Sequence, residues 1–361
     1  MTISDYLRLK IQISSNKKMQ KKNTTLQILI PTYNRADLLS ECLESIISQM
    51  HEYSEFVSIL VADNNSVDHT SEIVRLHSES SKISVKYIKQ PVNIGFSENL
   101  GKGITECSAT WVWLLGDDDF LLPGALRTVI ALLSEETTDA SNVISVLYAE
   151  CEQNLSSIST RNITTYKSGI VTSSQFLSNG LPYLTFLSQF ILRRSDYIAY
   201  YKPDENKFRF VPHLKVIGKM LSQTQPYFIN QYCVMGRRNH TGLSQWNGIW
   251  PVVFGFEHPD IIADISSYSS LPRKTLGFVN IRAWFVMAIF REEYALPFIH
   301  SSRPSSWKFR YKLIVIFENL LESETLRSLV KRIITKLYRD RISDSLNNAK
   351  KLFEVNSEIR N

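Results

Sequence analysis

The feature that most constrains the fold is a short apolar or alternating run that recurs four times in the first third of the chain, each time followed within three residues by a polar loop. The four runs are LQILIP at 26–31, FVSILVAD at 56–63, VKYIKQ at 85–90 and WVWLL at 111–115. They predict strands, and the apolar spacing of three and four from Leu38 to Met50 predicts an amphipathic helix between the first two. Strands that alternate with helices indicate βαβ units, and so an α/β fold with parallel strands covered by helices.

In a parallel sheet, ligands bind beyond the carboxyl ends of the strands, where the loops meet the helix N-termini. The segments that follow the four runs are polar and rich in Asp and Asn: Thr32–Arg35, Asp63–Ser66, Asn93–Gly95 and Gly116–Asp119. We therefore expect these four loops to surround one crevice that holds the functional residues.

Three adjacent carboxylates, Asp117, Asp118 and Asp119, lie between the apolar segments WVWLLG and FLLPGAL. Their mutual repulsion opposes folding, and a hard divalent cation such as Mg²⁺ or Mn²⁺ relieves it by binding carboxylate oxygens. Such an ion commonly keeps coordination positions for phosphate oxygens. The trio therefore predicts a metal site for a substrate that carries a diphosphate, and a solvated acidic turn is the alternative.

Asp63 follows the second strand, where its carboxylate can accept a hydrogen bond from the imide of uracil or thymine, or from a ribose hydroxyl. Thr32 and Tyr33, on the neighbouring loop, would supply a further hydrogen bond and a flat face for the base. The alternative is structural, because Asp63 and Asn65 also suit the cap of the next helix.

The segments ILIPTYNR, VADNNSVDHT, NIGFSENLGKGI and LLGDDDFLLPGAL, in this order, resemble family 2 of the inverting glycosyltransferases with the GT-A fold. The resemblance covers about residues 25–135 and fades by about residue 245. It implies a Rossmann-like mixed sheet flanked by helices, a nucleotide-diphosphate sugar donor, Mn²⁺ or Mg²⁺ as cofactor, and inversion at the anomeric carbon. The motifs are similar to those of bacterial O-antigen and capsule transferases, including abequosyltransferase-like ones, which implies a glycan acceptor linked to polyprenyl diphosphate.

The resemblance also implies a role for individual residues. The metal would be held by Asp117, Asp118 and Asp119, although the choice of the two that grip it stays open. Arg237, Arg238 and His240 would stabilise the leaving diphosphate, with a solvated basic turn as the alternative. The remaining residues that would bind the nucleotide sugar are Thr32, Tyr33, Arg35, Asp63, Asn65, Asn93, Gly95 and Asn99.

Two positions depart from the family pattern. Gly116 stands where many members have the first aspartate of the metal motif, and Ser97-Glu98-Asn99 stands where members often have Ala-Arg-Asn. The second departure removes an expected positive charge.

Inverting transfer needs a general base that takes the proton of the acceptor hydroxyl. The family pattern places an aspartate ahead of a helix for this role, and the register of FRFVPHLKVIGKML puts His213 there. A histidine accepts a proton near neutral pH, so the substitution is chemically coherent. Asp204 and Glu205 are the rival candidates, and a packed or capping His213 is the structural alternative.

We expect three regions along the chain: a basic lead-in at 1–24, the catalytic domain at 25–245, and a mainly helical, basic appendage at 246–361. Residues 1–22 carry a net charge of +5 and residues 303–361 a net charge of +6, around a mildly acidic body. This distribution favours contact of the ends with an anionic membrane surface over a nucleic-acid-binding protein. The alternatives are solvated ends and C-terminal helices that pack on the catalytic domain.

The sequence shows no signal peptide, no apolar run long enough to span a bilayer, and four cysteines without paired spacing. We therefore expect a cytoplasmic protein, peripheral at the inner face of the plasma membrane. A nucleotidyltransferase would need a glycine-rich loop after the first strand, where this chain has PTYNR. A dinucleotide oxidoreductase is excluded because Gly101-x-Gly103 falls at the end of a helix. The remaining alternative is a nucleotide-sugar or glycan binding protein with an impaired catalytic centre.

Overall fold

The computed structural model describes residues 25–81, 83, 85–135, 140–151, 158–160, 166–178, 184–203 and 211–237, together with residues 261, 328 and 332. The expected basic lead-in at 1–24 lies outside the described residues, as does nearly all of the expected helical region at 246–361. Both expectations stay predictions.

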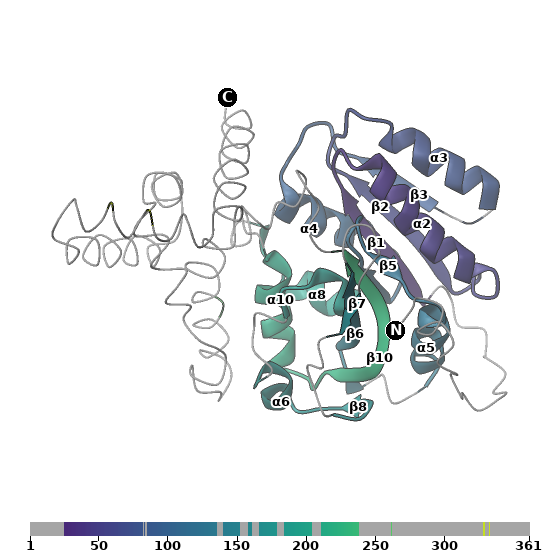
Figure 1. The fold of residues 1–361 in the computed structure, drawn as a ribbon. Coiled ribbons are helices and arrows are strands. Elements are labelled where there is room, and N and C mark those ends of the chain that lie inside the picture. The colour runs from purple at the N-terminus through teal and green to yellow at the C-terminus, as the bar shows by residue number, and fades with distance from the viewer. Residues whose placement is uncertain are drawn as a thin grey trace.

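The described part is built on one mixed sheet, with the strand order β3-β2-β1-β4-β9-β6-β10-β5 (Figure 1). The first four strands in the chain are parallel to one another: β1 (Leu26–Thr32), β2 (Val57–Asp63), β3 (Val85–Lys89) and β4 (Trp111–Leu114). They coincide with the four apolar runs, so the predicted βαβ arrangement is confirmed.

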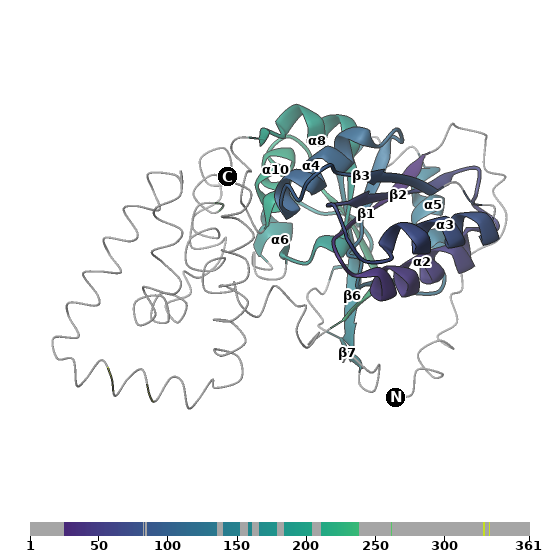
Figure 2. The same ribbon diagram turned by 90° about the horizontal axis from the view of Figure 1, so that it is seen from above.

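Helices cover both faces of this sheet, as the view from above shows (Figure 2). The helices that follow the first strands are α2 (Ala36–Met50), α3 (Thr70–Ser81), α4 (Phe96–Glu106) and α5 (Ala125–Leu133). Alternate residues of β1 point to opposite faces. Ile28 therefore packs in the core beneath α2, α3 and α5, whereas Leu29 packs in the core beneath α4.

The second half of the described part completes the mixed sheet with both parallel and antiparallel pairs. Its elements are β5 (Phe120–Leu121), β6 (Val143–Cys151), β7 (Ile158–Thr160), β8 (Gly169–Ile170), α6 (Ser173–Ser178), the 3-10 helix η2 (Leu187–Gln189), β9 (Phe190–Arg193), α8 (Arg194–Tyr200), α10 (Pro212–Leu221) and β10 (Tyr227–Arg237). β9 is antiparallel to both β4 and β6, and β10 is antiparallel to β5. The pairing of β10 with β5 brings the end of β10 beside the aspartate loop, which the sequence did not predict.

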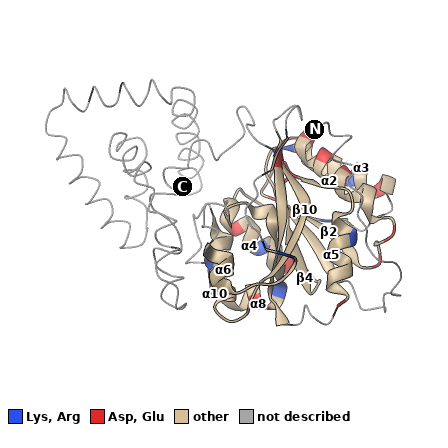
Figure 3. Cartoon of the chain, turned by 60° about the horizontal axis from the view of Figure 1, so that its bottom comes forward, with Lys and Arg blue, Asp and Glu red and all other residues tan. Residues whose placement is uncertain are grey.

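Acidic residues lie along the outer faces of α2 and α3 (Figure 3), as expected of an acidic body. No helix in the described part of the chain combines the length and the apolar character that a membrane span requires.

One aspartate ties the first two βα loops together. Asp68 accepts a hydrogen bond from the backbone N–H of Ala36, the first residue of α2, at 3.0 Å. Its other oxygen accepts from the backbone N–H and the hydroxyl of Thr70, at the start of α3, at 3.1 and 2.6 Å. Asp68 therefore caps two helix N-termini at once, which fixes the loops that carry the predicted nucleotide site.

We predict that Asp68→Ala lowers the free energy of unfolding by about 1–2 kcal/mol, because buried N–H donors at two helix starts lose their acceptor. Urea denaturation followed by circular dichroism measures this. The control is Asp37→Ala, which removes an exposed carboxylate from the first turn of α2. Equal effects of the two substitutions would show that the cap does not matter.

Candidate functional site

The four predicted loops meet at one edge of the sheet, because β1 to β4 are parallel and their carboxyl ends coincide. Side chains join the loops. The backbone N–H of Asn34 donates to the hydroxyl of Ser66 at 2.9 Å, and the Asn64 amide donates to Asn93 Oδ1 at 2.6 Å. Together with the contacts of Arg35, these bonds confirm that the four loops form one polar region.

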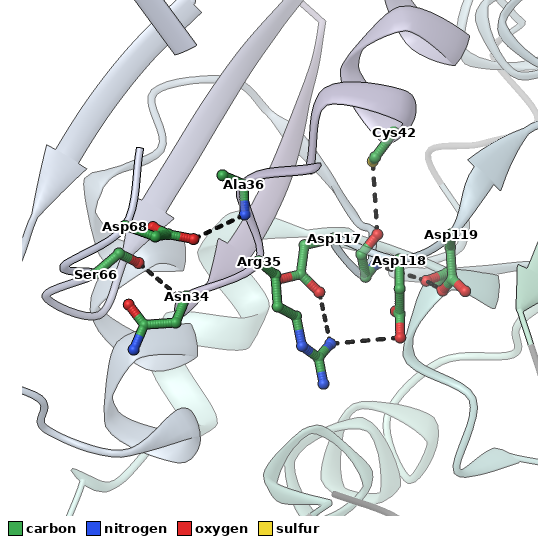
Figure 4. Close-up of polar contacts among 11 residues, drawn as sticks. Asn34, Arg35, Ala36, Cys42, Ser66, Asp68, Asp117, Asp118 and Asp119 are labelled. Carbon is green, nitrogen blue, oxygen red and sulfur yellow. Dashed lines mark hydrogen bonds and ion pairs between the residues drawn. The ribbon is translucent and has the colours of Figure 1, made fainter. Parts of the chain in front are cut away.

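Arg35 joins the first loop to the aspartate loop. Its Nη1 lies 2.8 Å from Asp117 Oδ1 and 3.4 Å from Asp118 Oδ2, so one guanidinium nitrogen bridges two carboxylates (Figure 4). Asp117 and Asp119 are buried, whereas the Asp118 side chain is 26% exposed. The structure therefore gives the three neighbouring carboxylates three different environments.

Asp119 is held by a serine from η2. The Ser188 hydroxyl donates to Asp119 Oδ2 and accepts the backbone N–H of Gly116 at 2.8 Å. The backbone N–H of Arg237, at the end of β10, also donates to the Asp119 carboxylate. Asp119 is thus anchored to two segments that lie far along the chain.

The crowding of charge is visible in the pKa values. Burial raises the pKa of Asp117, and the Arg35 cation opposes this rise. Burial and the neighbouring Asp118 raise the pKa of Asp119 well above its ordinary value. A carboxyl group whose pKa is raised by folding loses stabilisation as the pH rises through that pKa, so the ionised loop costs folding free energy at neutral pH.

These residues fit a hard divalent cation. The loop offers carboxylate oxygens, which Mg²⁺ and Mn²⁺ prefer, and Arg35 alone does not balance three negative charges. Asp118 has the most accessible carboxylate of the three. Among the described residues, no three His, Cys, Asp or Glu side chains already converge around one point. A bound ion would therefore draw further ligands from water or from a phosphate.

Gly116 accounts for one departure from the family pattern. A Cβ on Gly116 would lie 2.8 Å from Asp119 Oδ2 and 3.1 Å from Asp118 Oδ1. Because a Cβ does not approach another atom as closely as 2.8 Å, a side chain at position 116 would require the Asp119 carboxylate to shift.

Asp63 is fully buried, and its carboxylate already accepts three hydrogen bonds. The Ser66 N–H and hydroxyl donate to Oδ1 at 2.9 and 2.5 Å, and the Tyr87 hydroxyl donates to Oδ2 at 2.6 Å. A carboxylate offers about four acceptor positions, so at most one remains for a ligand. Its neighbour in the sheet register is the predicted residue Thr32, which is also buried, whereas Tyr33 is half-buried.

The residues predicted to lie beside the diphosphate of the donor, Asn93, Gly95 and Asn99, also have structural roles. Asn99 is buried and donates to the carbonyl of Ala62 at 2.8 Å, which fastens α4 to β2. Asn93 Oδ1 accepts from the backbone N–H of Gly95 at 2.9 Å. A Cβ on Gly95 would meet no atom within 4 Å, so space does not require glycine here. Its φ of +82° does favour glycine, because other residues rarely adopt a positive φ. Asn65 also has a positive φ, of 69°.

Of the residues predicted to stabilise the leaving diphosphate, the structure describes Arg237. The Arg237 guanidinium is buried, pairs with Glu41 at 2.5 Å and lies over the Phe120 ring at 4.6 Å. These contacts direct it to α2 and β5, and only its backbone N–H reaches Asp119. The other two residues of this group, Arg238 and His240, lie outside the described residues.

His213 is fully buried in the first turn of α10, with its ring 5.9 Å from that of Phe190. Burial lowers the pKa of His213 to about 4, so its ring is neutral at pH 7. This position suits the packed histidine that was the structural alternative, and the role of general base stays a prediction. The rivals Asp204 and Glu205 lie outside the described residues.

Ser188 is the site residue that sequence reasoning missed. It lies 69 residues after Asp119 in the chain, in a segment that carries no recognisable motif. No local pattern distinguishes a serine that binds a distant carboxylate from one that caps a turn, so only the fold reveals it.

Comparison with known proteins places this site in a family. The family model described as Glycosyl transferase family 2 matches residues 27–197, which include Arg35, the aspartate trio and Ser188. This part of the chain belongs to glycosyl transferase family 2. The match ends before His213 and Arg237.

Two curated relatives come from bacteria. Over 111 residues, the chain is 34% identical to GalNAc(5)-diNAcBac-PP-undecaprenol beta-1,3-glucosyltransferase of Campylobacter jejuni, a match that covers 30% of this chain and 35% of the relative. It is 28% identical to abequosyltransferase RfbV of Salmonella typhimurium, over 31% of this chain and 33% of the relative. The chain thus matches about a third of the length of these relatives.

A solved structure extends the likeness beyond the family 2 domain. The crystal structure of S. aureus TarS 1-349 in complex with UDP-GlcNAc superposes with a TM-score of 0.54 and 14% identity, over 92% of each chain. At this identity the likeness shows the fold alone. The α/β GT-A fold implied by the sequence is confirmed, with its mixed sheet flanked by helices.

We predict that Asp118→Asn makes the metal-free protein more stable than the wild type at neutral pH. The physical reason is that Asp118 raises the pKa of both Asp117 and Asp119, so its removal lowers the cost of ionising them. The gain is full above those raised pKa values and disappears below the ordinary carboxyl pKa of 3.8. Thermal unfolding in EDTA between pH 3 and 8 measures it.

The matched control is Asp196→Asn on α8, which removes a part-exposed carboxylate 3.8 Å from Arg193. It should leave the pH profile unchanged. If Asp118→Asn were less stable than the wild type at pH 8, the repulsion within the trio would not be the dominant charge interaction of this loop.

Proposed function

We propose that the chain is a metal-dependent, inverting glycosyltransferase that moves a sugar from a nucleotide-diphosphate sugar to a hydroxyl of a bacterial surface glycan such as O-antigen. The observation that carries this proposal is the trio Asp117–Asp119, held beside Arg35 at the carboxyl edge of the sheet within a family 2 domain. A cluster of unbalanced carboxylates at that edge suits a cation that accompanies a diphosphate.

The names of the curated relatives support the acceptor class. One transfers glucose to an undecaprenol-diphosphate-linked glycan, and the other is an abequosyltransferase. For this chain we propose a glycan acceptor linked to polyprenyl diphosphate, and a cytoplasmic location with peripheral contact to the inner face of the membrane. The basic segments that would touch anionic lipid lie outside the described residues.

In the proposed reaction, the acceptor oxygen bonds to the anomeric carbon while the bond from that carbon to the diphosphate oxygen breaks. The leaving diphosphate keeps the bonding electron pair, and the acceptor proton passes to a general base. Mn²⁺ or Mg²⁺, held by the aspartate trio, would neutralise the charge that builds on the diphosphate. Arg35, whose guanidinium lies at the same loop, would add positive charge beside the phosphates.

The nucleoside would lie against the first two loops, with Tyr33 beneath the base and Thr32 and Asn65 beside it. Asp63 would contribute its last acceptor position to the base or ribose, and otherwise holds the loop in shape. Asn93, Gly95 and Asn99 would shape the diphosphate side from the neighbouring loop.

A second candidate function is a nucleotide-sugar or glycan binding protein with an impaired catalytic centre. The burial of His213 favours it, because an enclosed imidazole with a lowered pKa is a weak base. Release of nucleoside diphosphate from a panel of nucleotide sugars with Mn²⁺ separates the two candidates. Slow release supports the enzyme, whereas tight binding without turnover on any acceptor supports the binding protein.

We predict that Asp119→Ala abolishes metal-dependent binding of the donor and leaves the fold intact, because it removes a carboxylate of the metal site. Thermal shift with Mn²⁺ and a nucleotide-sugar panel measures binding, and circular dichroism measures the fold. Asp37→Ala is the control and should behave like the wild type. An Asp119→Ala variant that still transfers sugar at an unchanged rate would show that the metal assignment is wrong.

We propose His213 as the general base, which requires its buried ring to become accessible during turnover. His213→Ala is then expected to lower kcat by about a hundredfold or more, with donor affinity nearly unchanged, since a base acts in the chemical step. Steady-state kinetics of His213→Ala and Asp204→Asn measure this. A fully active His213→Ala variant, together with an inactive Asp204→Asn variant, would move the base to Asp204.

A further inference from the structure

We propose that Ser188 is a positioning residue that fixes the Asp119 carboxylate for metal binding. The proposal rests on the function proposed above, and it adds a residue from a different part of the chain to the metal loop. Ser188 itself would not touch the ion, since its hydroxyl is directed to Asp119 Oδ2.

The direction of both hydrogen bonds at Ser188 follows from the chemistry of the partners. The Gly116 N–H can only donate, so the Ser188 oxygen accepts from it at 2.8 Å. The single hydroxyl proton of Ser188 is then left for Asp119 Oδ2, which accepts it. The hydroxyl therefore links the first residue of the GDDD segment to its last residue.

The backbone of Ser188 is held independently of Asp119. Its carbonyl accepts the indole N–H of Trp113, on β4, at 2.9 Å, and the residue has no exposed surface. Since the strand that leads into the aspartate loop also anchors η2, the hydroxyl is already in place before any ligand arrives. Preorganisation of this kind lowers the cost of arranging a ligand set.

The three carboxylates then differ in freedom. Ser188 and the Arg237 N–H restrain Asp119, and Arg35 restrains Asp117 at 2.8 Å. Within the described part of the chain, the Asp118 side chain has only the longer contact to Arg35, at 3.4 Å. Without Ser188, the Gly116 N–H and an Asp119 oxygen would both lack a buried partner. The expected response is rotation of Asp119 away from its present position, which would weaken metal binding.

The test measures Mn²⁺ binding to the full chain by the electron paramagnetic resonance signal of free Mn²⁺, with Mn²⁺ alone and with Mn²⁺ plus UDP. Ser188→Ala should weaken Mn²⁺ binding by roughly tenfold or more, since its hydroxyl bonds to a charged group. Ser188→Thr keeps the hydroxyl and should restore binding to within a few-fold of the wild type. Circular dichroism and thermal unfolding report the fold of each variant.

Ser145→Ala is the matched control, because Ser145 is also buried and bonds to Gln189 of the same 3-10 helix, at 3.3 Å, but not to an aspartate. It should bind Mn²⁺ like the wild type. If Ser188→Ala does not fold, Ser188→Cys replaces it, because a thiol of similar size is a weaker donor and should weaken Mn²⁺ binding.

The outcomes separate the two proposals. If the wild type binds Mn²⁺ and folded Ser188→Ala or Ser188→Cys binds it equally well, the positioning role is wrong and the proposed function stands. If Ser145→Ala weakens binding as much as Ser188→Ala does, the effect is general to the packing of η2 and the positioning role is again wrong. If the wild type binds no Mn²⁺ with or without UDP, the metal dependence of the proposed function fails, and the role of Ser188 fails with it.

Discussion

The repulsion among three carboxylates at the end of a buried strand is the interaction on which the rest of the site depends. Packing Asp117 and Asp119 out of water raises the pKa of both, and Arg35 compensates only part of the charge. A fold selected for stability alone would not keep such a loop, since unbalanced buried charge costs folding free energy. The arrangement is reasonable if a cation completes it, and this is why the loop indicates function more strongly than any other feature of the chain.

The fold accommodates this loop of crowded carboxylates by fixing the segments around it. Parallel strands bring four loops to one edge, and hydrogen bonds between side chains of different loops, such as Asn64 to Asn93, hold them together. The segment from η2 to β10 closes the other side, where Ser188 and the Arg237 backbone reach Asp119. The metal-binding oxygens of a site on such a scaffold stay in place because contacts with neighbouring segments hold each loop.

The sequence predicted the parts of the structure that local patterns determine. The four strands, the helices between them and the meeting of their loops follow from apolar periodicity and the geometry of parallel sheets. It did not predict the Ser188 bond to Asp119 or the pairing of Arg237 with Glu41, because these contacts join residues 69 and 196 positions apart. The family pattern put His213 at the position of the general base. The sequence did not predict that His213 is fully buried, because burial depends on how the core packs.

The most direct test of the account is anomalous scattering from crystals grown with Mn²⁺ and a nucleoside diphosphate. We expect a manganese peak within coordination distance of carboxylate oxygens of the Asp117–Asp119 trio, with phosphate oxygens completing its ligands. A nucleotide bound without any manganese peak at the trio, or a peak elsewhere in the molecule, would contradict the claim that the clustered carboxylates exist to bind a cation.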